Sequence, residues 1–334
     1  MSKIHCIFVF LFVSFFIFGC PELPGQNTTI MFYNVENLFD TKDDSTKNDN
    51  EFLPDGDKKW DYYRYNKKLN SIFKVISAVG SFNKPPDVIG FAEVENHQVL
   101  YDLCTKTPLE KFEYKIVHFE SPDFRGIDVG LIYNPAKITV INKTALPVKN
   151  PDNINWATRD ILYISFTTET ADTFHLFVNH WPSRRGGVEK SESKRILAAQ
   201  TLRKSIDSLY NKHICPNIII MGDFNDEPNN NSINKVLIGS FINSEMECRK
   251  LINLKTSMDR EITGSYKYRG YWQKYDQIII SSNLSNRSNA KVFYNNFILI
   301  EDSKYGGYQP FRTYLGPRYK GGYSDHLPVV IIIE

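Results

Sequence analysis

The stretch that most constrains the fold is Asn217 to Pro228, which reads NIIIMGDFNDEP. Its apolar run, Ile218 to Met221, stops at Gly222, as expected of a strand that is buried on both faces. An acid and an amide follow, Asp223 and Asn225. Unpaired polar groups are costly to bury at the rim of a core, so groups delivered there commonly bind something. The alternative is an Asp/Asn turn that closes a hairpin. A binding site requires that other strands place further polar groups at the same edge, whereas a hairpin turn does not.

Length and composition suit one large core or two smaller ones. The chain has 334 residues, of which 42% are hydrophobic and 14% are aromatic. The formal net charge is +2, so no overall field indicates nucleic acid or membrane as a partner. Any such preference must come from local clusters of charge.

The first 19 residues are typical of a signal peptide: Lys3 is followed by an almost unbroken apolar run from Ile7 to Phe18. Gly19 then precedes Cys20, and this pair resembles the lipobox of bacterial lipoproteins, whose cysteine is lipidated and becomes the mature N-terminus. We therefore predict a signal peptide at 1–19, lipidation at Cys20 and a polar tether at 20–28. The protein would be exported and membrane-anchored in the bacterial envelope, on its periplasmic or surface face. An uncleaved anchor is the alternative, for which the apolar span is short.

The other cysteines show no sign of a catalytic or zinc site. Once Cys6 and Cys20 are set aside, Cys104, Cys215 and Cys248 remain, widely spaced and without a C-x-x-C pair. Three cysteines in an exported chain leave at least one thiol without a partner inside the chain.

Hydrophobic periodicity predicts a mixture of strands and helices. Helices are expected at 67–79, 97–106 and 195–210. Strands are expected at 29–35, 87–92, 114–119, 129–133, 138–141, 160–167, 173–180, 218–221, 275–281, 291–300 and 327–333. The chain has no internal repeat and no linker long enough to divide it. The sequence thus predicts one domain over 29–334 with mostly antiparallel sheet.

Polar residues of a few kinds recur at the ends of these strands. Singly, each has a plain structural explanation, such as a turn cap or a hydrogen bond inside the core. Their shared placement is harder to explain in that way, because strand ends meet at one edge of a packed sheet. The residues are Asn34, Glu93, His180, Asp223, Asn225, Asp276, Asp325 and His326.

These residue types suit one reaction. Glu93, with Asn34 and Asp325, offers the hard oxygen ligands that Mg²⁺ prefers. Two histidines and two aspartates can move protons and activate water near neutral pH. The chain contains no Ser-His-Asp nucleophile elbow, no Walker loop and no glycine-rich dinucleotide motif. Metal-assisted hydrolysis of a phosphate ester is the predicted chemistry.

Six motifs occur in the order seen in the endonuclease/exonuclease/phosphatase family, which the chain resembles from about Thr29 to Glu334. They are MFYNVENL, VIGFAEVEN, VNHWPS, IIIMGDFNDEP, YDQIIIS and SDHLPVV. The family includes deoxyribonuclease-like nucleases, sphingomyelinases and inositol phosphatases. The resemblance implies an α/β (α+β) fold: a four-layer α/β/β/α sandwich of two packed mixed, mostly antiparallel sheets flanked by helices, with the site at one edge.

The resemblance also implies a metal centre and a water-binding pair. Glu93 resembles the principal metal ligand, with Asn34 and Asp325 nearby. The metal would be Mg²⁺, with Mn²⁺ as the alternative. Asp223 and Asn225 resemble the pair that orients the attacking water and holds the phosphate.

Two histidines and several arginines complete the implied site. His326 resembles the catalytic histidine, oriented by Asp276. His180 resembles the second histidine of the deoxyribonuclease-like branch, a phosphate ligand or leaving-group acid, and Asp128 is expected to support it. Arg184 and Arg185 follow the histidine strand, and a solvated basic loop is the alternative for this pair. The candidate phosphate contacts are Arg125, Arg159, Arg184 and Arg185.

The favoured function is that of a Mg²⁺-dependent phosphodiesterase, a nuclease acting on nucleic acid without an obligate protein partner. A sphingomyelinase, a phospholipid-head-group phosphodiesterase or a small-molecule phosphatase of the same fold is the alternative, and a non-catalytic binding module is the third. The inositol phosphatase box C-D-R-I here begins with Tyr275 and has Gln277 at its third position, which counts against an inositol phosphate. The run from Phe311 to Tyr323 mixes aromatic and cationic residues, which suits either stacked bases or a lipid interface.

Overall fold

The computed structural model describes residues 27–80, 83–239, 246–258 and 261–334. The predicted signal peptide, the Cys20 lipidation site and most of the predicted tether lie outside the described residues. Within the described part, no helix combines the length and the apolar character needed to cross a membrane.

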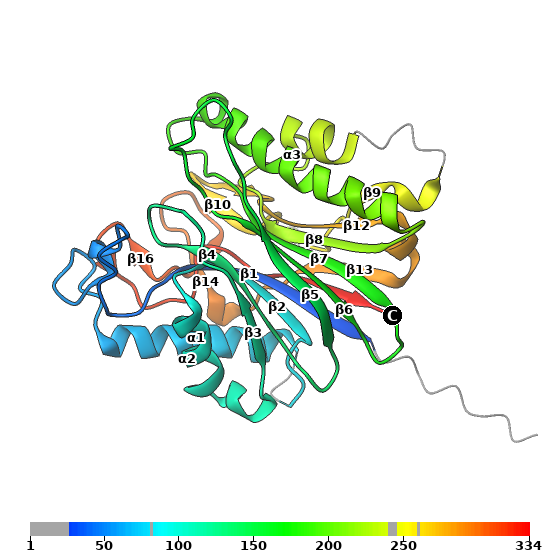
Figure 1. Ribbon diagram of the computed structural model, residues 1–334. Coiled ribbons are helices and arrows are strands. Elements are labelled where there is room, and N and C mark those ends of the chain that lie inside the picture. Colours follow the sequence, from blue (N-terminus) through cyan, green and yellow to red (C-terminus); the bar gives the residue numbers. More distant parts are fainter. Residues whose placement is uncertain (1–26, 81–82, 240–245, 259–260) are drawn as a thin grey trace, which may run out of the picture.

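Two six-stranded sheets pack face to face at the centre of the molecule (Figure 1). The first has the order β13 (Ser288–Val292), β18 (Val329–Ile333), β1 (Thr28–Leu38), β2 (Val88–Val94), β4 (Asp128–Tyr133) and β3 (Lys115–His118). The second has the order β5 (Thr139–Leu146), β6 (Ile161–Thr167), β7 (Thr173–His180), β8 (Asn217–Asp223), β12 (Asp276–Ser281) and β9 (Leu251–Asn253). Two neighbouring pairs are parallel, β1 with β2 and β7 with β8, and the other pairs within these sheets are antiparallel.

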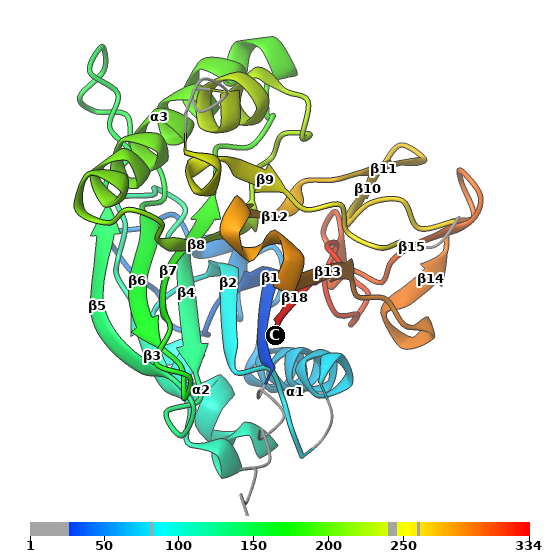
Figure 2. The ribbon, with the colours of Figure 1, turned by 90° about the vertical axis from the view of Figure 1, so that its right-hand side faces the viewer.

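Helices cover the two outer faces (Figures 1 and 2). On the first sheet lie α1 (Tyr62–Val79), capped by the Asp61 side chain, and α2 (His97–Thr105), capped by Asn96. On the second lie α3 (Val188–Lys212) and a π-helical segment, Ser232–Ile238. The predicted sandwich of two mixed sheets with flanking helices is confirmed.

Strand β8 shows why the opening stretch is apolar throughout. Successive side chains point to opposite faces of a strand. Ile218 and Ile220 pack with the residues of α3, whereas Ile219 and Met221 pack into the core shared by the two sheets. Both faces of β8 are therefore buried. Gly90 in β2 permits the close approach of the sheets, because a Cβ there would lie 2.5 Å from the Met221 Cε atom.

Three small hairpins and several short turns extend from the sandwich. The hairpins are β10 (Tyr266–Tyr268) with β11 (Tyr271–Gln273), β14 (Leu299–Glu301) with β15 (Tyr308–Pro310), and β16 (Tyr314–Leu315) with β17 (Arg318–Tyr319). The short 3-10 turns are Asn50–Phe52, Pro108–Phe112, Glu247–Arg249, Ser282–Arg287 and Asn296–Ile298.

The prediction of one continuous strand at 291–300 is wrong. Strand β13 ends at Val292, a 3-10 turn follows at Asn296–Ile298, and β14 begins only at Leu299. The Asn295 side chain accepts a hydrogen bond from the Phe297 amide and caps the turn, which ends the extended run. Helices α1 and α3 also begin before the predicted residues, since their first turns lack the apolar periodicity.

Among the cysteines that the structure describes, pairing leaves one thiol free. Cys215 and Cys248 form a disulfide with a Cα–Cα distance of 5.5 Å, and Cys104 is a buried free cysteine. The prediction of at least one unpaired thiol is confirmed, and the free thiol lies in the core rather than at the polar edge.

Candidate active site

Three strands of the second sheet deliver polar side chains side by side. The pairing register aligns His180 at the end of β7 with Asp223 at the end of β8. It aligns Asp223 in turn with Asp276 at the start of β12. The apolar run of β8 therefore positions its terminal carboxylate between a histidine and a second carboxylate.

The first sheet adds Asn34 and Glu93 through two adjacent irregularities rather than through strand ends. Strand β1 continues to Leu38 with a register shift after Asn34, and β2 shifts its register around Glu93. Glu93 has a φ of 62°, in the left-handed region that costs a side-chain-bearing residue energy. Bulges of this kind re-aim side chains near active sites. Asn225 (φ 50°) is also left-handed, so backbone strain gathers at the site.

A hydrogen bond joins the two sheets at this edge. The Asn34 side-chain amide donates to Asp223 Oδ2 at 3.0 Å, and the Asn225 backbone amide donates to Asp223 Oδ1 at 2.9 Å. Asp223 is nearly fully buried. Both its oxygens are thus held in place from opposite sides.

His326 and Asp276 form a buried pair. The distance from His326 Nδ1 to Asp276 Oδ2 is 2.7 Å, and Ser265 Oγ donates to the same oxygen at 2.5 Å. This contact places the Nδ1 proton toward Asp276 and leaves Nε2 facing Asp223 Oδ2 at 3.8 Å. The Tyr266 ring lies against the imidazole, with centroids 4.7 Å apart. The imidazole is therefore fixed in both orientation and tautomer.

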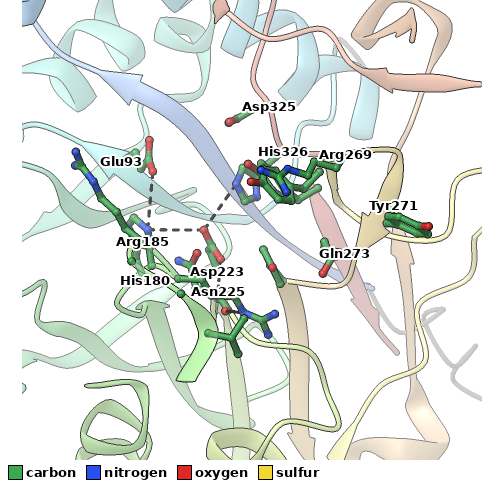
Figure 3. A pocket seen from close by; sticks show the side chains of 18 of the residues that line it. Glu93, His180, Arg185, Asp223, Asn225, Arg269, Tyr271, Gln273, Asp325 and His326 are labelled. Carbon is green, nitrogen blue, oxygen red and sulfur yellow. Dashed lines mark hydrogen bonds and ion pairs between the residues drawn. The ribbon is translucent and has the colours of Figure 1, made fainter. Parts of the chain in front are cut away.

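His180 lies on the other side of Asp223. Its Nε2 is 3.7 Å from Asp223 Oδ2 and 3.9 Å from Glu93 Oε1, contacts drawn in Figure 3. Its Nδ1 is buried without a hydrogen-bond partner in the described part of the chain. Asp128 was expected to support this histidine, and that expectation is wrong: Asp128 contacts His118 Nε2 at 3.1 Å and accepts a hydrogen bond from the Ser121 amide.

Their surroundings shift the pKa values of His180 and His326 in opposite directions. Burial and the nearby guanidinium groups of Arg159 and Arg125 hold the pKa of His180 well below its usual value. Burial also lowers the pKa of His326, but the Asp276 and Asp223 carboxylates outweigh it, so the His326 pKa lies well above the usual value. One imidazole is set up to be neutral and the other to carry a proton.

The two sheets bring the predicted residues around one cavity. It has a volume of about 770 Å³ and is lined by Glu93, His180, Asp223, Asn225, Asp325 and His326, among others (Figure 3). Asn34 and Asp276 stand directly behind this lining through their contacts with Asp223 and His326. Asp325 is partly exposed, and its Oδ2 lies 3.5 Å from Arg312 Nη2.

The four predicted arginines all line the cavity but differ in how they are held. Arg159 is buried and donates to Asp123 and to the Trp181 carbonyl. Arg125 donates to the Asn37 side chain at 2.6 Å.

Arg184 is held by protein acceptors. It donates to Asp226 Oδ1, Asn230 Oδ1 and the Asn225 carbonyl, and its guanidinium lies 4.9 Å from the centroid of the Tyr275 ring. These acceptors hold the guanidinium through Nε and Nη2, and Arg184 still lines the cavity, so its contact with phosphate stays a prediction. Arg185 lines the cavity beside His180 (Figure 3).

Asp226 follows the predicted pair and is completely buried. It forms an ion pair with Arg195, whose Nε lies 2.7 Å from Oδ2, and accepts hydrogen bonds from Arg184 Nη2 at 2.8 Å and from Ser232 Oγ at 2.6 Å. By its place in the sequence alone Asp226 would be a turn or rim residue, because an acid after a strand gives no sign that an arginine from a distant helix will meet it. Asp226 instead joins α3 to the turn that carries Asn225.

Sequence reasoning missed two buried charged residues, Glu36 and Lys68. The Glu36 carboxylate accepts the backbone amides of Thr313 and Tyr314, and Lys68 Nζ donates to Thr313 Oγ1 and the Tyr323 carbonyl. Burial raises the pKa of Glu36 to about 7 and lowers that of Lys68 to about 8. A lysine on the apolar side of a predicted helix was the available signal.

The run from Phe311 to Tyr323 is a structural element rather than an open aromatic surface. Tyr314 is buried and packs against Phe52 and Trp60, with centroids 6.4 Å and 6.0 Å away. Tyr319 stacks under the Arg64 guanidinium of α1. The aromatic residues that line the cavity come from 266–275 instead.

Comparisons with known proteins agree with this geometry. The sequence profile of the "Endonuclease/Exonuclease/phosphatase family" matches residues 29–334. No curated protein sequence matches the chain. Among solved structures, an endonuclease/exonuclease/phosphatase family protein from Bacteroides thetaiotaomicron superposes with a TM-score of 0.57 at 15% identity, covering 92% of this chain and 98% of that one.

Two further solved structures have the same fold. A mannosyl-6-phosphatase of Bacteroides thetaiotaomicron gives a TM-score of 0.57 at 15% identity, over 92% of this chain and all of that one (100%). The human Nocturnin catalytic domain with a bound sulfate anion gives 0.56 at 16% identity, over 92% and 94%. The chain therefore belongs to the endonuclease/exonuclease/phosphatase family of metal-dependent phosphoesterases.

Proposed function

We propose that the protein is a Mg²⁺-dependent phosphodiesterase that cleaves nucleic acid by in-line attack of water. The observation that carries this proposal is the row of His180, Asp223 and Asp276, with His326 fixed against Asp276 at 2.7 Å and facing the same cavity. Family members act on phosphodiester or nucleic-acid substrates, which supports the same chemistry.

The donor atoms at Glu93 fit a hard divalent cation. One Glu93 oxygen accepts the Asn37 amide at 3.0 Å, and the carboxylate lines the cavity together with Asp325. Carboxylate and amide oxygens are the ligands that Mg²⁺ prefers, and Mn²⁺ accepts the same set. We assign the metal to Glu93, Asn34 and Asp325. When bound, the cation supplies positive charge to the phosphate oxygens and the leaving oxygen.

A second cluster of candidate ligand atoms, Asp223, Asp276 and His326, lies within 4.8 Å of one another. We assign it to proton transfer instead, because Asp276 Oδ2 already accepts from His326 and Ser265. Hydrogen bonds of this kind orient the imidazole as a general acid or base.

The residues of the chain divide the remaining work. Asp223 and Asn225 orient the attacking water, since both face the cavity and are fixed to one another. His326 holds or moves a proton at Nε2, while Asp276 fixes its tautomer. His180 and the cationic lining from Arg125, Arg159 and Arg185 contact the phosphate. The site thus places proton transfer on one side of the phosphate and positive charge on the other.

We also propose that the protein is exported and anchored to the bacterial envelope, which would leave both soluble and lipid substrates within reach. We propose that residues 1–19 are a signal peptide, that Cys20 is lipidated and that 20–28 tether the domain at 29–334. Strand β1 begins at Thr28 and reaches the site only at Asn34, so the site lies about 20 Å along the strand from the tether. The Cys215–Cys248 disulfide supports an oxidising compartment. A Cys20→Ala protein should lose incorporation of labelled palmitate and leave the membrane fraction; unchanged labelling would contradict lipidation.

One substrate panel tests the proposed function. Single-stranded and plasmid DNA, RNA, sphingomyelin vesicles and mannose 6-phosphate are incubated with Mg²⁺, Mn²⁺, Ca²⁺ or chelator. We expect cleavage of nucleic acid with Mg²⁺ or Mn²⁺, none with chelator, and weaker binding as salt rises. Hydrolysis of vesicles or of the sugar phosphate alone would favour the lipid or phosphatase alternative. No metal-dependent hydrolysis at all would favour a non-catalytic binding module.

A further inference from the structure

The β10–β11 hairpin turns one complete face toward the cavity. Its register pairs Tyr266 with Gln273 and Tyr268 with Tyr271, so these four side chains lie on the same face. All four line the cavity. The intervening pair, Lys267 with Trp272, belongs to the other face. Three tyrosines on one side of an eight-residue hairpin make an aromatic wall.

The back of the hairpin is anchored to the protein. Lys267 is buried, and its Nζ donates to the Gly306 carbonyl at 2.7 Å and pairs with Asp302 at 3.1 Å. At the tip, Arg269 and Gly270 have φ values of 49° and 87°, the combination that a tight two-residue hairpin turn requires. A Cβ at Gly270 would lie 3.0 Å from the Tyr305 side chain, so the tip is packed as well. The aromatic wall is therefore held in place from behind.

The wall begins at the reacting centre and ends in solvent. Tyr266 contacts the His326 ring and stacks on Tyr275, with ring centroids 5.6 Å apart. Two residues further along β10, about 7 Å away, Tyr268 is 54% exposed, and its partner Tyr271 is 75% exposed. Neither exposed ring adds to the core. Large exposed aromatic rings beside a cavity are typical of binding surfaces.

The opposite wall is cationic. It consists of Arg185 and the segment Gly186–Val188, which includes the first residue of α3. The amino end of a 25-residue helix carries positive partial charge, which adds to that of the arginine. The guanidinium of Arg269, at the hairpin tip, also lines the cavity and lies 5.2 Å from the centroid of the Tyr268 ring. The cavity therefore offers both charge complementary to phosphate and flat rings.

We propose that Tyr268 and Tyr271 form a stacking platform for an unpaired base, and that the enzyme accordingly prefers single-stranded nucleic acid to duplex. This inference rests on the proposed function. Aromatic side chains bind single strands by stacking on bases while cations follow the backbone. In a duplex, both faces of each base are covered by the neighbouring bases of the stack. Only an unpaired base can therefore stack on the two tyrosines.

Abasic substrates separate stacking from catalysis. The full-length protein is assayed with Mn²⁺ or Mg²⁺ on a single-stranded oligonucleotide, on its duplex, and on an abasic strand of equal length. The variants are Tyr268→Ala, Tyr271→Ala and Tyr271→Phe. The control is Tyr63→Ala, a tyrosine of α1 that is 71% exposed and outside the cavity lining.

We expect each alanine variant to lower kcat/KM on the base-containing strand roughly 5- to 150-fold, mainly through KM. The same variants should behave like the unaltered enzyme on the abasic strand. Tyr271→Phe, which keeps the ring, and Tyr63→Ala should have no effect. Equal losses on abasic and base-containing strands, no loss on either, or a preference for duplex would overturn the platform but leave the phosphodiesterase intact. Inactivity of the unaltered enzyme on every strand would overturn both.

Discussion

His326 and Asp276 lie 50 positions apart in the chain, and their side chains meet at 2.7 Å in the buried edge of the second sheet. The contact holds the imidazole so that its other nitrogen faces Asp223 and the cavity. A histidine held by a carboxylate in this way is oriented for proton transfer before substrate arrives.

Removing the imidazole should stop turnover without unfolding the protein. We expect His326→Ala to lower kcat roughly 10²- to 10⁴-fold on a phosphodiester in the presence of Mg²⁺ or Mn²⁺. Asp276→Asn should lower kcat in the same direction, since an amide no longer enforces the Nδ1-protonated tautomer. Circular dichroism and the melting temperature of each variant serve as the fold control. Full activity in His326→Ala would rule out the assigned role.

Metal binding should depend on Glu93 and not on its neighbour Glu95. The Glu95 carboxylate is directed away from the cavity lining, accepts the Asp40 amide at 2.6 Å, and has a pKa raised by burial to about 8. We expect Mg²⁺ or Mn²⁺ to raise the melting temperature of the unaltered protein and of Glu95→Gln, because a ligand that binds only the folded state stabilises it. Glu93→Gln should lose most of this shift. An undiminished shift in Glu93→Gln would place the metal elsewhere.

Asp226 should be a stability residue. Its replacement by Asn leaves the fully buried Arg195 without its charge partner. Breaking a buried ion pair in this way costs about 3–5 kcal/mol of unfolding free energy. The matched control is Glu227→Gln, the next acid along the chain, which is half-buried and accepts the Lys274 amide at 3.0 Å. A glutamine oxygen can still accept this bond, so we expect a change of about 0.5 kcal/mol or less. Chemical denaturation measures the unfolding free energy of both variants. Equal losses for the two variants would contradict a stabilising role of the buried Asp226–Arg195 pair.

His175 should make stability fall in acid. Burial, with a smaller contribution from His213, lowers the pKa of His175 to about 4 in the folded protein. The unfolded value is about 6.5, so below that pH the unfolded chain binds the proton more tightly. The stabilising effect is therefore complete above about pH 6.5 and is lost as the pH falls toward 4.

The size of that loss can be measured against a variant without the imidazole. After allowance for partial solvent screening, we expect no more than about 2–3 kcal/mol. Unfolding free energies between pH 7 and pH 4 should fall less for His175→Phe than for the unaltered protein. His97→Asn, which alters an exposed histidine at the start of α2, should follow the unaltered protein. Parallel pH profiles for all three proteins would show that His175 is not the group responsible.

The sequence by itself determined the elements and the chemistry of the site. Strand β8 contains the apolar run Ile218 to Met221, and helix α1 contains the helical spacing of 67–79. Both were predictable because burial on two faces of a strand, or on one stripe of a helix, requires apolar residues at fixed spacings. The polar residues at strand ends were visible because each stands next to such a run. Their types alone indicated a phosphate ester and a hard cation.

Only the tertiary structure decided which side chains are paired within the protein and which face the cavity. Nothing in the sequence shows that Asp226 and Arg184 are paired. In the structure Asp226 pairs with Arg195, 31 positions away, and with Arg184, 42 positions away. The aromatic run at Phe311 to Tyr323 was conspicuous and is packed, whereas Tyr268 and Tyr271 were overlooked and face the cavity. Local patterns report burial along one strand or helix, but the partner that covers a side chain is set by sheet register and packing between distant segments.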